Sequence, residues 1–163
     1  MKYIDTSVII SALDPKDTSS IISNKALKAK GKIISELVTA ELSSALSRNK
    51  NVVKLMDEIS GDRTSSWYAV ILYIIQKFDL LFIPLQQANI ETPIGKYGNI
   101  ISFAIELIKD VPLRTLDLLH ISYAYAIGDA TKSDIEFVTR DKEFEGYKSE
   151  IYSSTGIKVS YIL

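Results

Sequence analysis

The chain has 163 residues, of which 47% are hydrophobic and 24% charged, a composition typical of a compact globular domain that buries its own core. It contains no cysteine and one histidine, so disulfides and thiolate metal sites are excluded and oxygen atoms are the expected ligands of any metal. The net charge of -1, from 19 basic and 20 acidic residues, does not mark a nucleic-acid-binding protein.

The hydropathy pattern gives no sign of membrane insertion. The N-terminus lacks the long apolar stretch of a signal peptide, and the longest apolar run, residues 68–75, is too short to cross a bilayer. We therefore expect a cytoplasmic protein with no membrane contact, and we interpret residues 68–75 as a buried helix.

The first fifty residues alternate between predicted strands and helices. The pattern predicts a strand at 2–4, a helix that ends before Pro15, a helix from about 18 to 30, a strand at 32–35 and a helix from 36 to 49. Asp5 follows the first strand directly. In an open parallel sheet, ligands bind at the carboxyl ends of the strands, so Asp5 is the first candidate for a functional site.

Glu41 is unusual within the helix predicted at 36–49. It falls where the apolar stripe that contains Val38 and Leu42 calls for an apolar side chain. Acids are rarely buried without a partner, so Glu41 either serves a site or lies at the rim of the stripe and reaches water. The sequence leaves both interpretations open.

The middle of the chain, about 50–110, is predicted to be mainly helical. Helices are expected near 52–60, 65–78, 86–96 and 99–109, with a strand at 80–83 before Pro84.

The next predicted helix begins near Thr115 and is apolar on nearly every side up to Gly128. Such helices are usually buried, so Asp117 has little water to solvate it. A simpler explanation is an acid in the first turn that complements the helix dipole, with Thr115 as N-cap. His120 lies on an apolar stripe of this helix, and we interpret it as a packed residue rather than a catalyst.

The last third of the chain repeats the arrangement seen at Asp5. Residues 135–139 alternate like a strand, Asp141 follows them, and 156–162 form a last strand. Strands separated by helices predict an α/β fold with three α/β/α layers and a central, mostly parallel sheet, within a single domain at 1–163.

Four acids, Asp5, Glu41, Asp117 and Asp141, are thus expected at one edge of the sheet. Such a cluster suits Mg²⁺ or Mn²⁺, which take carboxylate oxygens and retain water. A bound metal lowers the pKa of a coordinated water, so hydrolysis of a phosphodiester would need no histidine base.

The sequence resembles the PIN-domain ribonucleases, in particular the VapC-type toxins of toxin–antitoxin pairs. The resemblance rests on four segments, at 3–7, 35–42, 116–124 and 137–141, and leaves about 50–110 unmatched. It implies that Asp5, Glu41, Asp117 and Asp141 hold the metal and that Ser7 and Thr139 support it. It also implies RNA cleavage, homodimerisation and inhibition by a cognate antitoxin. Four basic residues could contact RNA phosphates or simply be solvated: Arg48, Lys50, Arg140 and Lys142.

Three alternatives remain. The chain could be a catalytically silent PIN-like module that binds RNA or protein. It could be a phosphatase with Asp5 as nucleophile, although the common motif has a second Asp where this chain has Ser7. A nucleotide-binding domain is also conceivable, but no Gly-rich phosphate loop follows the first strand.

Overall fold

The computed structural model describes residues 1–49, 52–53, 63–85 and 89–163. Its core is a sheet in the order β3-β2-β1-β6-β7, in which every neighbouring pair is parallel. The strands are β1 (Lys2–Ile4), β2 (Lys32–Ile34), β3 (Leu81–Phe82), β6 (Glu136–Thr139) and β7 (Lys158–Tyr161).

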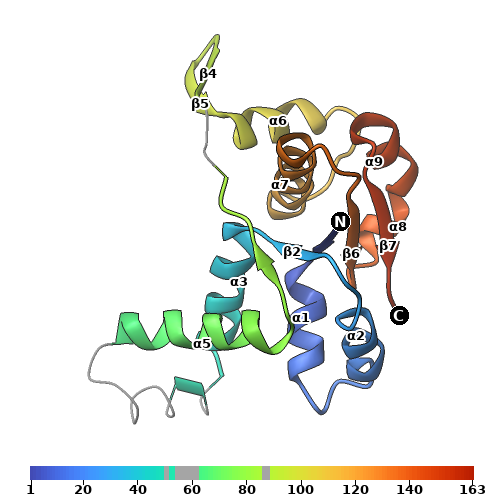
Figure 1. The fold of residues 1–163 in the computed structure, drawn as a ribbon. Helices are drawn as coiled ribbons and strands as arrows, with labels where there is room; N and C mark the ends of the chain where they lie inside the picture. The colour runs from blue at the N-terminus through green and yellow to red at the C-terminus, as the bar shows by residue number, and fades with distance from the viewer. Residues whose placement is uncertain (50–51, 54–62, 86–88) are drawn as a thin grey trace.

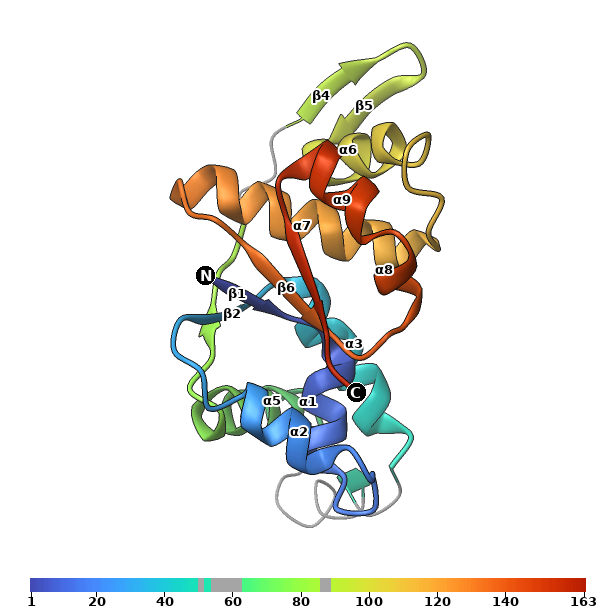
Figure 2. The same cartoon turned by 90° about the vertical axis from the view of Figure 1, so that its right-hand side faces the viewer.

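Helices cover both faces of this sheet (Figures 1 and 2). On one side lie α1 (Thr6–Leu13), α2 (Ser20–Ala26), α3 (Glu36–Ser47) and α5 (Arg63–Lys77), and on the other lie α6 (Asn99–Leu107), α7 (Thr115–Thr131) and α9 (Lys148–Thr155), with the short α8 (Glu143–Gly146) beside β7. The three-layer α/β/α architecture expected from the sequence is therefore confirmed.

Burial on both faces of the sheet explains why the central strands are continuous apolar runs in the sequence. Tyr3, Ile4, Ile33, Ile34 and Phe137 are fully buried, because strands covered on both faces expose neither side to water. In the described part of the chain, no helix has the length and apolar character needed to cross a membrane.

The predicted helix at 86–96 is wrong where the structure describes it. Residues 89–98 form an antiparallel hairpin of β4 (Asn89–Thr92) and β5 (Gly95–Gly98), which projects from the body of the molecule (Figure 1). The turn falls at Pro93 and Ile94, and Gly95 adopts a φ of 126°, which side chains disfavour. The turn-forming residues Pro93 and Gly95 thus decide the local structure, against the helix that the pattern predicted.

The buried helix predicted at 68–75 is only half buried. Ile71 and Ile74 of α5 pack into the core, whereas Tyr68, Leu72 and Tyr73 are 73%, 54% and 59% exposed. The helix packs against α3, and the exposure of these three side chains leaves its other face open to solvent. Of the helix predicted at 52–60, only 52–53 lie within the described residues, and these are helical.

Three helix ends also differ from expectation. The N-cap of α7 is Arg114 rather than Thr115, and it makes no side-chain capping bond. The helix continues past Gly128 to Thr131, and Gly128 matters for packing instead: a Cβ there would lie 2.9 Å from Cγ1 of Ile135. The second helix ends at Ala26, short of the predicted 30.

Candidate active site

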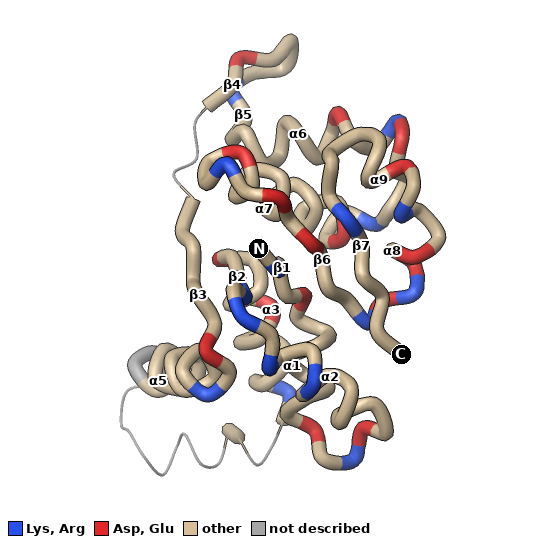
Figure 3. Tube along the Cα trace, turned by 45° about the vertical axis from the view of Figure 1, so that its right-hand side comes forward, with Lys and Arg blue, Asp and Glu red and all other residues tan. Residues whose placement is uncertain are grey.

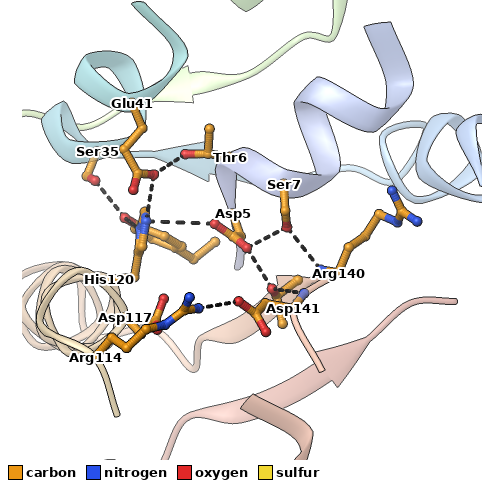
Figure 4. Close-up of polar contacts among 12 residues, drawn as sticks. Asp5, Thr6, Ser7, Ser35, Glu41, Arg114, Asp117, His120, Arg140 and Asp141 are labelled. Carbon is orange, nitrogen blue, oxygen red and sulfur yellow. Dashed lines mark hydrogen bonds and ion pairs between the residues drawn. The ribbon is translucent and has the colours of Figure 1, made fainter. Parts of the chain in front are cut away.

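The parallel register of β1 and β6 brings their carboxyl ends together. Ile4 pairs with Val138, and the backbone N–H of Asp5 donates to the Val138 carbonyl at 3.0 Å. The residues that follow the two strands, Asp5 and Asp141, therefore emerge at one edge of the sheet. The N-terminal halves of α3 and α7 face this edge and contribute Glu41 and Asp117 (Figure 4).

All four predicted acids line one cavity of about 590 Å³. The side chains that border it with them include Thr6, Ser7, Arg48, Arg114 and His120. Asp5 and Asp117 thus line the same cavity.

Asp5 is buried and held by two hydroxyl groups. It is 6% exposed, and its Oδ2 accepts hydrogen bonds from Ser7 Oγ and Thr139 Oγ1, both at 2.6 Å. These hydroxyls are fixed in turn, because the N–H of Arg140 donates to Ser7 and that of Asp141 donates to Thr139. Ser7 and Thr139 therefore orient the Asp5 carboxylate.

Glu41 lies at the rim of the cavity but is not simply solvated. Its side chain is 24% exposed, and Oε2 accepts from Thr6 Oγ1 and lies 2.8 Å from His120 Nε2. Burial raises the pKa of Glu41, but the His120 and Thr6 contacts outweigh it, so the pKa is lowered overall and the carboxylate is favoured.

His120 is packed, as the sequence suggested, but it is also part of the site. It is 2% exposed, and Nε2 lies 3.7 Å from Asp5 Oδ1 as well as bonding to Glu41. Burial lowers the pKa of His120, yet the bond to Glu41 and the charge of Asp5 raise it above its ordinary value. Its ring is therefore the basic partner of these two acids.

Asp117 and Asp141 form a second group with Glu143 around one cation. Arg114 Nε lies 2.8 Å from Asp117 Oδ2 and 3.2 Å from Glu143 Oε2, and its terminal nitrogen lies 2.6 Å from Asp141 Oδ2. Burial raises the pKa of Asp117, Arg114 lowers it, and the acids nearby raise it again. The net shift is upward, so a further positive charge would be favourable here.

The donors suit a hard divalent cation. Asp5, Glu41 and His120 each offer an atom within 4.8 Å of the others, and so do Asp117, Asp141 and Glu143. Carboxylate oxygens dominate both groups, as Mg²⁺ and Mn²⁺ require. The Arg114 guanidinium shows that the second group already accommodates positive charge.

Three participants were not recognised as site residues from the sequence: Arg114, His120 and Glu143. A signal existed for Arg114, which precedes Asp117 by three residues, a spacing that allows side chains to meet on a helix. Glu143 lies only two residues after Asp141, in the first turn of α8, and this spacing gives no such signal. Nothing local indicated the link between His120 and Glu41, which are 79 residues apart.

Comparison with known proteins agrees with this geometry. A family model described as the PIN domain matches residues 2–149, whereas no curated protein matches the chain. Among solved structures, VapBC2 from Rickettsia felis bound to a DNA fragment from its promoter aligns over all of both chains, at 16% identity and a TM-score of 0.56. Mycobacterium tuberculosis VapC20, a sarcin-ricin loop cleaving toxin, aligns over 90% of this chain and 94% of its own, at 12% identity and a TM-score of 0.54. Since the family model spans almost the whole sequence and both structures share its fold, the chain belongs to the PIN-domain family.

Proposed function

We propose that the protein is a metal-dependent endoribonuclease that hydrolyses RNA phosphodiester bonds as the toxin of a toxin–antitoxin pair. The observation that carries this proposal is the convergence of four acids from four separate segments on one cavity. Asp5, Glu41, Asp117 and Asp141 would hold Mg²⁺ or Mn²⁺ there. A metal in such a site lowers the pKa of a bound water and offsets negative charge at the reacting phosphate.

The residues of the chain supply orientation and charge. Ser7 and Thr139 fix the Asp5 carboxylate, so its free oxygen keeps one direction in the cavity. Arg114 lines the same cavity. Its guanidinium can bind a phosphate group through two hydrogen bonds, in bidentate geometry, once its ion pairs with Asp117 and Asp141 break. No histidine base is needed in this scheme, which agrees with a single histidine that is almost fully buried.

RNA contacts are assigned from the cationic residues near the cavity. Arg48 lines it, whereas Arg140 is bound to Asp17 at 2.6 Å and is less free to contact phosphate. Lys142 is exposed, and Lys50 lies outside the described residues. Basic and acidic residues are interspersed along the trace (Figure 3). We therefore expect a modest affinity for RNA that depends on contacts at the cavity rather than on a broad positive surface.

The toxin assignment and its partners rest on the solved structures. VapBC2 is a complex bound to promoter DNA, and VapC20 is named as a toxin that cleaves the sarcin-ricin loop. By analogy we propose an RNA substrate, a cognate antitoxin, a homodimer and action in the cytoplasm. The exposed apolar side chains on α5, among them Tyr68 and Leu72, support binding to a protein partner.

The test is cleavage of RNA by purified Asp5→Asn and Asp117→Asn in Mg²⁺ or Mn²⁺. Both variants should lose cleavage while keeping the circular dichroism spectrum of the parent. Asp129→Asn is the matched control, because Asp129 is an exposed acid on the same helix as Asp117. Undiminished cleavage by the first two variants would refute the proposal.

A catalytically silent PIN-like module is the second candidate. It is favoured by Arg114, which already forms ion pairs with Asp117 and Asp141, two of the carboxylates that a metal would need. Such a module would bind RNA or protein without cutting RNA in any divalent metal, and replacing the acids would leave its binding unchanged.

A further inference from the structure

His120 connects the hydrophobic core to the active site. It lies in the first half of α7 with both ring nitrogens in contact with other side chains (Figure 4). Nδ1 is 3.2 Å from Tyr3 Oη, and Nε2 is 2.8 Å from Glu41 Oε2. Tyr3 Oη is also 2.6 Å from Ser35 Oγ, so four side chains form one continuous chain.

The ionised carboxylate of Glu41 determines the direction of the last hydrogen bond in this series. An ionised glutamate can only accept hydrogen bonds, so Nε2 of His120 must donate to Glu41. In the neutral ring Nδ1 then accepts, Tyr3 donates to it and Ser35 donates to Tyr3. If the ring is charged, Nδ1 donates to Tyr3 instead. The bond from Nε2 to Glu41 is the same in both cases.

The core holds the ring in this orientation. Tyr3 is fully buried on β1, stacked on Phe137 at 5.5 Å with an interplanar angle of 21°. The His120 ring meets Tyr3 edge to face at 6.0 Å, and Ser35 is fully buried at the start of α3. A ring packed at 2% exposure between these groups cannot turn without losing both bonds.

A purely structural role does not account for the imidazole. The His120 ring lies 6.0 Å from the Tyr3 ring and 6.2 Å from the Phe137 ring, both fully buried, and an apolar side chain at 120 would pack against these rings without needing polar partners. The polar ring instead gives Glu41, a half-buried side chain on a different helix, a fixed donor.

We propose that His120 is a positioning residue of the active site: anchored by Tyr3, it holds the Glu41 carboxylate beside Asp5 in the orientation that a divalent cation requires. The proposal rests on the proposed function, because it concerns the same metal centre. Groups that orient metal ligands typically contribute about 10- to 100-fold to metal affinity.

The test is Mn²⁺ binding by isothermal titration calorimetry, which needs no RNA. His120→Leu keeps an apolar volume but removes the donor, and its Mn²⁺ affinity should fall by about 10- to 100-fold. His120→Gln can place an amide N–H where Nε2 lies and should recover most of the affinity. His120→Asn reaches only as far as Nδ1 and should not. Tyr3→Phe keeps the stacked ring but removes the anchor, so it should also weaken binding.

The control is Tyr125→Phe, which removes a hydroxyl from the same helix at a ring that stacks on Phe103. Urea unfolding in EDTA separates folding from positioning, because a merely structural residue would change stability while folded variants bound Mn²⁺ normally. Folded His120→Leu with the affinity of the parent would overturn the proposal and leave the proposed function intact. A parent protein that binds no Mn²⁺ would overturn both.

Discussion

Metal binding should raise the melting temperature of this protein, and Asp117→Asn should abolish that rise. The acids of the cavity repel one another, and His120 and Arg114 compensate them only in part, so a divalent cation stabilises the folded state by mass action. At a metal concentration of about 100 times Kd the gain is about 2.7 kcal/mol.

The size of the chain converts this gain to temperature. An unfolding entropy of about 2.1 cal/mol/K per residue gives about 0.34 kcal/mol/K for 163 residues, so Tm should rise by about 8 °C. The assay is differential scanning fluorimetry in EDTA and in increasing Mn²⁺ or Mg²⁺. In EDTA, Asp117→Asn should melt at or above the parent's Tm, because burial and neighbouring acids raise the pKa of Asp117 more than Arg114 lowers it.

Asp129→Asn, on the exposed face of the same helix, should respond to metal like the parent. Two results would refute the reasoning. One is a melting temperature that neither ion changes at millimolar concentrations. The other is an equal rise in the parent and in Asp117→Asn, which would place the bound ion elsewhere.

Three further predictions concern other parts of the structure. Burial raises the pKa of Glu136, but the Ser160 hydroxyl and the Lys2 ammonium lower it by more. The carboxylate should therefore add about 0.5 kcal/mol to the free energy of unfolding at pH 7 relative to Glu136→Gln, and this contribution should fade as the pH falls below the ordinary pKa of 4.5. Urea titrations at several pH values can measure it. Phe137→Ala empties a fully buried site and should cost about 3–5 kcal/mol in urea unfolding, and a loss below about 1 kcal/mol would contradict the packing described. Arg114→Met should bind Mn²⁺ several-fold more tightly than the parent in calorimetry, because no guanidinium competes for the carboxylates. The Mn²⁺ affinity of Arg114→Lys should stay close to that of the parent. Equal affinity in all three proteins would show that Arg114 does not compete with the metal.

The sequence by itself determined the fold class and the place of the acids. Asp5 directly follows a short apolar run and Asp141 comes two residues after a β-branched one, and parallel strands bring such ends together. Glu41 and Asp117 were recognisable because they interrupt apolar helix stripes. These signals are local, since they depend on side-chain period and on the cost of burying a charge.

Only the tertiary structure decided which side chains meet. It divided the acids into one group around His120 and another around Arg114, joined Asp5 to Thr139 across 134 residues and placed a hairpin where a helix was predicted. It also left one face of α5 exposed, because helix burial depends on the elements that pack on it. The position of Asp5 at the edge of the sheet is therefore predictable from the sequence. Its partners depend on packing between segments far apart in the chain, which no local pattern encodes.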